Sequence, residues 1–177
     1  MGSKADITDM KMHEMPVAGP SIVHGFEGKG KSLETERLYL EKADVRHLDA
    51  WYEAMIDGYE DGVKWLKWSE KVPSKDAVRE NIEQWIQECA SGYYRRFFIF
   101  KKEKNQLIGV IGFYKDGKPD QVQLSYYMRQ SERNKGYMTE MVNAVVTWVQ
   151  EKWRISKVII RSEKNNIASV AIIRKVQ

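Results

Sequence analysis

The spacing of hydrophobic and polar positions predicts both helices and strands from Leu33 onward. Polar and apolar residues alternate over residues 37–42, which favours a strand. Apolar residues recur at helical spacing in four later segments, namely those that follow Asp44 and Ser74, and residues 139–152 and 168–176. Runs rich in aromatic and β-branched residues predict four further strands over residues 96–102, 107–114, 121–128 and 157–161.

Short polar residues mark where several of these elements begin. Asp44 and Ser74 are predicted N-caps, because their side chains can accept hydrogen bonds from the free amides of a helix start. Gly58 and Gly62 bracket a stretch that we interpret as irregular. Turns or a helix end are predicted at three further places: Gly92, Lys104-Asn105 and Asp116-Gly117.

The predicted order β, α, α, β, β, β, α, β, α defines the fold class. Antiparallel hairpins come first and a β-α-β crossover comes last, which predicts an α+β sheet with helices packed on it rather than a doubly wound fold. Residues 1–32 lack this periodicity and hold five of the twelve glycines and two of the four prolines. We interpret them as a mostly irregular N-terminal extension that precedes one domain over residues 33–177.

Composition places the chain among ordinary globular proteins. Its 177 residues are 42% hydrophobic and 31% charged, with six Trp, nine Tyr and five Phe to build a core. Cys89 is the only cysteine, which excludes a disulfide within the chain and fits a reducing compartment, and three scattered histidines predict no metal site. Charges interrupt every apolar run and the first 25 residues show no signal-peptide pattern, so we expect a soluble, cytoplasmic protein with no membrane partner.

Charge narrows the kind of ligand that the chain suits. The 29 Lys and Arg exceed the 25 Asp and Glu by +4, which suits an anionic small molecule. The basic residues are interleaved with acids and form no continuous stripe, so we expect no nucleic-acid partner.

Residues 133–140, RNKGYMTE, have the pattern of a phosphate-binding turn between a strand and an amphipathic helix. Backbone N–H groups at a helix start, together with the helix dipole, favour an anion such as pyrophosphate. Gly136 permits a close approach to the backbone, and Arg133 and Lys135 add positive charge. From these residues alone, a basic solvated turn is an equally good interpretation.

The segment 133–138 also resembles the Arg/Gln-x-x-Gly-x-Gly/Ala acyl-CoA loop of the GCN5-related N-acetyltransferase (GNAT) superfamily. The surrounding chain resembles the RimJ/RimL branch through four motifs in the same order: LETERLYL at 33–40, IGVIGF at 108–113, LSYYM at 124–128 and NIAS at 166–169. Four motifs in this order are much more specific than the loop alone.

The resemblance implies an acetyl-CoA-dependent N-acetyltransferase with a mixed, mainly antiparallel sheet whose splayed parallel central strands are flanked by helices. The splayed pair would be residues 121–128 and 157–161. An amine would attack the thioester directly in a ternary complex, and N–H groups near Tyr127 and Met128 would stabilise the oxyanion. The amine acceptor would be a protein N-terminal α-amine or a small molecule.

The resemblance also implies individual site residues. Ser169 matches the family position proposed as the acid toward the leaving sulfur, and Asn166 matches a neighbouring polar contact, although both could serve only the helix start. Tyr127 completes the predicted catalytic set. Trp65, Trp68 and Tyr94 are acceptor-side candidates, but an aromatic residue is more often part of a core. The predicted cofactor-binding residues are Met128, Arg133, Asn134, Lys135, Gly136, Tyr137, Met138, Thr139 and Asn166.

Three positions depart from the family pattern. Many RimL-like enzymes carry a glutamate where this chain has Gln123, and glutamine cannot accept a proton at neutral pH. The alternative is relay through water to Glu70, Glu80 or a tyrosine. Small residues of the loop are replaced by Asn134 and Met138, which predicts a crowded cofactor site.

The chain ends at Gln177, where the family usually continues into two further strands, one of them beside residues 157–161. We therefore expect a C-terminally truncated domain. An unpaired central strand is a liability, so we expect that edge to be covered by residues 21–26, by a partner chain through a homodimer or strand exchange, or by a segment absent from this chain.

Two other functions stay open. Residues 25–32, GFEGKGKS, satisfy the P-loop pattern of nucleotide-binding proteins, but a P-loop requires a helix next, whereas residues 33–42 alternate with period two. The second alternative is an acyl-CoA-binding module without turnover, which Gln123 and the missing strands would favour.

Overall fold

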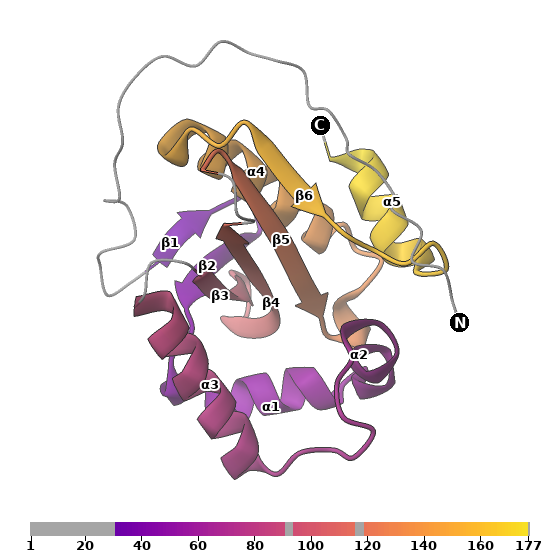
Figure 1. Cartoon of the computed structure of the whole chain (residues 1–177). Helices are drawn as coiled ribbons and strands as arrows, with labels where there is room; N and C mark the ends of the chain where they lie inside the picture. Colours follow the sequence, from indigo (N-terminus) through magenta and orange to yellow (C-terminus); the bar gives the residue numbers. More distant parts are fainter. Residues whose placement is uncertain (1–30, 91–93, 116–118, 177) are drawn as a thin grey trace.

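The computed structural model describes residues 31–90, 94–115 and 119–176, which form a six-stranded sheet with helices on both faces (Figure 1). The strands are β1 (Lys31–Glu34), β2 (Leu38–Lys42), β3 (Tyr94–Lys101), β4 (Gln106–Lys115), β5 (Gln121–Met128) and β6 (Lys157–Ile160). The α-helices are α1 (Leu48–Ile56), α2 (Tyr59–Leu66), α3 (Lys75–Ala90), α4 (Tyr137–Trp153) and α5 (Ile167–Lys175). Short 3-10 turns are η1 (Val45–His47) and η2 (Gln130–Glu132).

The spatial order of the strands across the sheet is the same as their order along the chain, and each neighbouring pair from β1 to β5 is antiparallel. β5 and β6 are parallel and are joined through α4. Their pairing starts where Gln121 lies opposite Lys157 and stops after Leu124 opposite Ile160, while β5 continues to Met128. The prediction of an α+β fold with a splayed parallel pair is confirmed.

Successive residues of the central strands serve two separate cores, one on each face of the sheet. In β2, Leu38 and Leu40 pack in the core that α4 covers, whereas Tyr39 packs in the core of α1 and α3. α4 lies behind β5 and β6 in Figure 1. The central strands are therefore largely buried on both faces, whereas β5 has an exposed residue, Ser125, in its middle and β6 is only partly buried.

Both predicted caps accept a hydrogen bond, although Asp44 caps the 3-10 turn η1, whereas α1 begins after His47. The Asp44 carboxylate accepts a hydrogen bond from the Arg46 N–H at 2.9 Å, and the Ser74 hydroxyl accepts one from the Ala77 N–H at 3.2 Å. Asn105 has a φ of 49°, as its predicted turn requires. The predicted features at Gly92 and Asp116-Gly117 lie outside the described residues.

The prediction of an irregular stretch between Gly58 and Gly62 is wrong, because α2 occupies this segment. Gly58 has a φ of 105° and is the N-cap of the helix. Gly62 is buried under the Trp68 ring, and a Cβ there would lie 2.0 Å from Trp68 Cε3. Gly58 is therefore needed for a positive φ, and Gly62 is needed for a close ring contact. In the sequence, the same two glycines look like helix-breaking signals.

β1 was not predicted as a strand of its own. It begins at Lys31 and pairs with β2, with Leu33 opposite Leu40. Strands rather than a helix therefore follow residues 25–30, which removes the structural context that a P-loop needs. Residues 25–30 themselves lie outside the described part of the chain.

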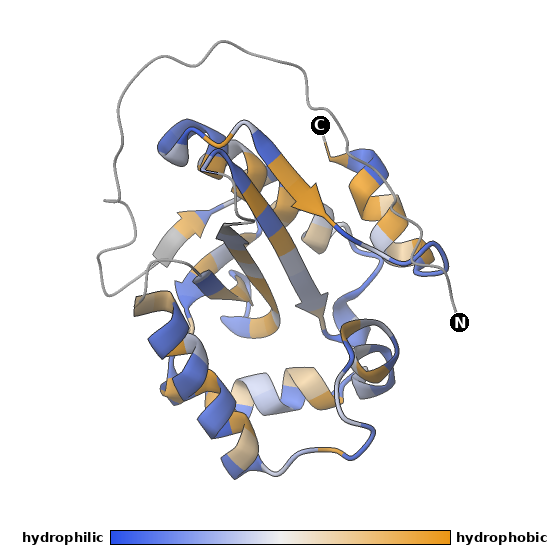
Figure 2. Cartoon of the chain, in the orientation of Figure 1, coloured by the Kyte–Doolittle hydropathy of each residue, from blue (hydrophilic) through white to orange (hydrophobic). Residues whose placement is uncertain are grey.

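β6 and α5 are the least covered elements of the described fold. β6 pairs with β5 along one edge, and the other edge has no partner strand among residues 31–90, 94–115 and 119–176. Residues 21–26, one predicted cover, lie outside these ranges, so the covering of β6 stays a prediction. α5 is largely apolar (Figure 2), yet it contains no buried residue, and Ile167 is 78% exposed. No helix in the described residues is long and apolar enough to cross a membrane.

Replacing Gly62 by alanine should destabilise the protein by about 1–3 kcal/mol, because the added methyl group overlaps the Trp68 ring. The measurement is the free energy of unfolding in urea for wild type, G62A, W68A and the double variant. The cost of G62A should largely disappear in the W68A background. An equal cost in both backgrounds would show that the ring contact is not its cause.

Candidate active site

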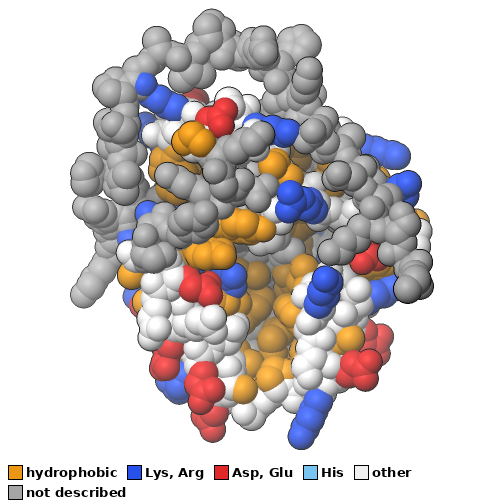
Figure 3. Space-filling view, in the orientation of Figure 1, with side chains coloured by type: hydrophobic (Ala, Val, Ile, Leu, Met, Phe, Trp, Pro, Cys, Tyr) orange, Lys and Arg blue, Asp and Glu red, His pale blue; other side chains and the backbone are white. Residues whose placement is uncertain are grey.

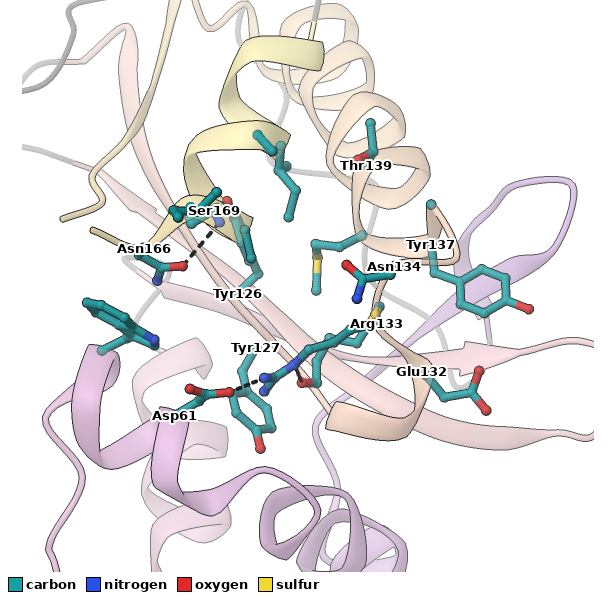
Figure 4. A pocket seen from close by; sticks show the side chains of 18 of the residues that line it. Asp61, Tyr126, Tyr127, Glu132, Arg133, Asn134, Tyr137, Thr139, Asn166 and Ser169 are labelled. Carbon is teal, nitrogen blue, oxygen red and sulfur yellow. Dashed lines mark hydrogen bonds and ion pairs between the residues drawn. The ribbon is translucent and has the colours of Figure 1, made fainter. Parts of the chain in front are cut away.

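A cavity of about 440 Å³ opens where β5 and β6 separate (Figure 4). It is bounded by the end of β5, the loop after it, the starts of α4 and α5, and α2. Every predicted site residue except Lys135 lines this cavity: Tyr127, Met128, Arg133, Asn134, Gly136, Tyr137, Met138, Thr139, Asn166 and Ser169. The structure thus brings together residues that are up to 42 positions apart in the sequence.

The loop between η2 and α4 leaves amides of the helix start open to the cavity. Gly136, the N-cap of α4, has a φ of 81° and no side-chain hydrogen bond that would cap the helix. The N–H groups of a first helical turn have no partner within the helix, so Tyr137, Met138 and Thr139 can offer donors to an anion. Asn134 has a φ of 61°, a conformation that asparagine tolerates, which explains how it can replace glycine here.

Met138 lines the cavity, but it is largely buried. Its side chain is only 5% exposed and packs in the core between α4 and the sheet. The backbone of this residue lies in the first turn of α4, where its N–H is oriented with the other open donors.

Glu140 ties the loop to the turn between β1 and β2. Its carboxylate accepts hydrogen bonds from the Thr35 hydroxyl, from the Arg37 N–H at 3.1 Å and from Arg37 Nε at 2.6 Å. Arg37 also donates to the Lys135 carbonyl and lies over the Tyr137 ring. Burial opposes ionisation of Glu140, but these hydrogen bonds outweigh it and lower its pKa.

Lys135 points away from the cavity into an ion-pair cluster. Its ammonium contacts Glu132 at 2.9 Å, and Lys101 at the end of β3 contacts the other oxygen of Glu132 at 3.0 Å. The side chains of Lys101 and Glu132 are each 9% exposed. Burial alone would raise the pKa of Glu132, but the two lysines more than compensate and lower it. The Lys135 side chain therefore stabilises the loop and does not reach into the cavity.

Arg133 already has protein partners on three sides. Its Nε donates to the Met128 carbonyl at 2.9 Å, its Nη1 pairs with Asp61 of α2, and its guanidinium lies 5.6 Å from the Tyr127 ring centre. Figure 4 shows Arg133 between Asp61 and the end of β5. This guanidinium links the loop to α2 rather than reaching freely toward a phosphate.

Asp57, which no sequence pattern selected, joins the helical layer to the same loop. Its carboxylate accepts from Arg129 Nε at 2.9 Å and from the N–H and hydroxyl of Ser131, and its carbonyl accepts from the Gln130 N–H at 2.8 Å. Burial works against ionisation of Asp57, but the hydrogen bonds from Ser131 and Arg129 lower its pKa overall.

The Tyr127 hydroxyl is directed away from the chemistry. It donates to the carbonyls of Met55 and Asp57, and burial raises the pKa of Tyr127 to about 12. Amides of successive strand residues point to opposite edges, and the Arg129 N–H bonds Ile108 of β4. By this alternation the Tyr127 N–H faces β4, whereas the Met128 N–H faces the gap beside β6.

On the other side of the gap, Ser169 shares a hydrogen bond with Tyr126, a residue that sequence reasoning missed. The two hydroxyl oxygens are 2.8 Å apart, and the Ser169 N–H bonds Asn166 Oδ1 at 3.2 Å. Asn166 therefore caps α5 and positions Ser169 toward Tyr126. Burial raises the pKa of Tyr126, and the hydrogen bond with Ser169 opposes part of that rise. Its place in the LSYYM motif was the signal available for Tyr126.

The remaining residues that the sequence analysis considered lie in several different places, and most of them are outside the cavity. The Gln123 side chain accepts a hydrogen bond from Arg161, which bridges β5 and β6 below the cavity. Trp65 lines the cavity, whereas Trp68 packs on Tyr59 and Tyr127. Tyr94 contacts the Tyr114 ring in a tilted arrangement and does not line the cavity; neither do Glu70 and Glu80. Among the described residues, no group of histidine, cysteine and acidic side chains could hold a metal ion.

Comparisons with known proteins define the family. The Acetyltransferase (GNAT) domain family matches residues 37–177, and the chain belongs to this family of acetyltransferases. It is 27% identical over 154 residues to the uncharacterized N-acetyltransferase YjdG of Bacillus subtilis (strain 168), covering 81% of this chain and 86% of that protein.

Two solved structures share the fold. One is RimL, a ribosomal L7/L12 alpha-N-protein acetyltransferase in complex with coenzyme A, with a TM-score of 0.71, 23% identity, and coverage of 81% of this chain and 80% of that one. The other is the microcin C7 self-immunity acetyltransferase MccE in complex with acetyl-CoA and AMP, with a TM-score of 0.76, 17% identity, and coverage of 86% and 83%.

Replacing Glu132 by glutamine should cost about 3 kcal/mol at neutral pH, because it leaves buried lysine charge unpaired. Since the folded-state pKa of Glu132 lies below the unfolded value of about 4.3, its carboxylate stabilises the fold above that pH and loses this effect as pH falls through the folded-state pKa. Urea unfolding at several pH values should show the gap between wild type and E132Q closing in acid. The exposed Glu103→Gln is the control, and a gap independent of pH would contradict this assignment.

Proposed function

We propose that this chain transfers an acetyl group from acetyl-CoA to a primary amine by direct attack. The observation that carries the proposal is that one cavity joins the uncapped start of α4, the unpaired end of β5 and the hydroxyl pair of Tyr126 and Ser169. Membership of the acetyltransferase family supports the same conclusion.

The lining of the cavity fits the parts of acetyl-CoA. Amides of Tyr137, Met138 and Thr139 would bind the pyrophosphate, and Gly136 presents no side chain that would obstruct it. The free edge of β5 offers backbone groups for the pantetheine amides. The apolar side of α5, through Ile172 and its neighbours, would cover the pantetheine chain. The structures of RimL and MccE hold coenzyme A and acetyl-CoA, respectively.

The reaction requires two proton movements. The amine loses a proton to solvent, and its nitrogen then attacks the thioester carbon to give a tetrahedral oxyanion, which the Met128 N–H would stabilise. The carbon–sulfur bond then breaks, and the hydroxyl pair of Ser169 and Tyr126 donates a proton to the departing thiolate. Solvent restores the donated proton. Asn166 acts by holding Ser169 in place.

The acceptor is a primary amine, either a protein N-terminal α-amine, as the name of RimL states for that enzyme, or a small molecule. We place the reaction in the cytoplasm, since it consumes acetyl-CoA and the single Cys89 thiol is half-buried and free.

Replacing Gly136 by tryptophan should weaken acetyl-CoA binding at least about tenfold, because the ring would fill the anion site. The positive φ also costs any L side chain about 1–2 kcal/mol, so the variant is tested below its melting temperature. The measurement is calorimetric titration with acetyl-CoA. Lys104→Trp is the matched control, since Lys104 is exposed in a turn and does not line the cavity, and it should bind as wild type does. Unchanged affinity in G136W would overturn the assignment of the loop.

Replacing Ser169 by alanine should lower kcat on the order of a hundredfold while changing the Kd of acetyl-CoA little. Tyr126→Phe should act through the same proton path, so the double variant should lose little more than the worse single variant. Release of free thiol from acetyl-CoA in the presence of amines measures turnover. Equal losses in binding and turnover would reduce Ser169 to a helix-start residue. Tight acetyl-CoA binding by wild type without any thiol release would establish the non-catalytic module instead.

A further inference from the structure

Asp61 is a carboxylate in the cavity that no sequence pattern selected. It lies on α2 one turn before Trp65, so both residues are on one face of the helix, and both line the cavity. Figure 4 shows the Asp61 side chain reaching from α2 toward Arg133. The start of this helix lies close to Arg133, because a Cβ on Gly58 would lie 2.9 Å from an Arg133 nitrogen.

Among the described residues, two acidic side chains line the cavity, Asp61 and Glu132. They differ in how many partners each already has within the protein. Glu132 is buried, and each of its oxygens accepts a hydrogen bond from a lysine. Asp61 uses Oδ2 to pair with Arg133, and its Oδ1 accepts no hydrogen bond within residues 31–90, 94–115 and 119–176. Asp61 can therefore still accept hydrogen bonds from a ligand.

Asp61 also lies close to the site of chemistry. A single guanidinium, that of Arg133, contacts both Asp61 and the carbonyl of Met128. Met128 ends β5 beside the gap, where its N–H would meet the acetyl oxygen. A group bound by Asp61 would therefore lie close to the end of β5, with only the Arg133 guanidinium between them. This strand end would position the thioester.

We propose that Asp61 binds the ammonium of the acceptor and aligns its nitrogen for attack, an inference that rests on the proposed function. A primary amine is mostly protonated at neutral pH, so its free form must be drawn from a bound cation. A carboxylate next to aromatic Trp65 and Tyr127 suits such a cation. Gln123 carries no charge and accepts a hydrogen bond from Arg161 instead.

The same carboxylate acts again during the reaction. The bound ammonium gives one proton to solvent, and the neutral nitrogen attacks the thioester carbon. Forming the new nitrogen–carbon bond returns positive charge to the nitrogen, and Asp61 stabilises that charge as it develops. The nitrogen releases its second proton to solvent when the carbon–sulfur bond breaks. The products are the N-acetylated amine, the free thiol of coenzyme A and one net proton.

The test compares Asp61→Asn with wild type on two acceptors of nearly the same shape. At neutral pH 2-phenylethylamine is a cation, whereas O-benzylhydroxylamine is neutral. D61N should lower kcat/KM for 2-phenylethylamine on the order of ten- to a hundredfold. The loss for O-benzylhydroxylamine should be at least about threefold smaller, because only the charge that develops during attack remains for Asp61 to stabilise. The Kd of acetyl-CoA should stay within about twofold, since an amide oxygen can still accept from Arg133.

Asp76→Asn is the matched control, because Asp76 is also in the first turn of a helix but is exposed and does not line the cavity. It should leave both acceptors unchanged. Equal losses on the two acceptors, or weaker acetyl-CoA binding as the main effect, would overturn the proposal and show that Asp61 only positions Arg133.

If wild type binds acetyl-CoA but acetylates neither these amines nor a mixed panel of primary amines and peptides, the proposed function fails and this inference fails with it. Turnover by wild type with unchanged kinetics in D61N overturns the inference alone.

Discussion

The early end of the pairing between β5 and β6 is the constraint on which the site depends. Four residue pairs hold the two strands together, and beyond Leu124 and Ile160 the strands separate. Backbone groups at an unpaired edge must find other partners, which leaves donors and acceptors available in a region that helices otherwise cover. The starts of α4 and α5 both lie at this opening, because each follows one of the two diverging strands.

A second constraint holds the helical layer against the loop that α4 starts from. Asp57 accepts hydrogen bonds from Arg129 and Ser131, and Asp61 pairs with Arg133, so two acids near the start of α2 engage successive parts of one loop. Both links cross from α1 and α2 to the loop after β5. The half of the site assigned to acetyl-CoA and the half assigned to the amine are therefore mechanically joined rather than independent.

Local patterns predicted most of the elements, since amphipathic spacing and capping residues act over a few positions. β5 matches its prediction at both ends, and Asp44 and Ser74 cap as expected. The loop and α5 residues were placed by motif resemblance, and the structure gathers them around one cavity. The contacts of Asp61 and Tyr126 were not predictable, because Asp61 meets Arg133 across 72 positions and Tyr126 meets Ser169 across 43. α2 was missed for a different reason, since Gly62 is required by a tertiary contact with Trp68 that the local sequence does not reveal.

The sparse packing of α5 has a consequence for how the protein behaves in a cell. A helix without a single buried residue gains little from the rest of the fold and belongs to the least stable part of the domain. If acetyl-CoA covers its apolar side, the ligand completes the folding of that segment and stabilises it by mass action. The fraction of molecules with α5 protected from proteases would then rise and fall with the acetyl-CoA supply, which would couple the survival of the protein to its proposed co-substrate.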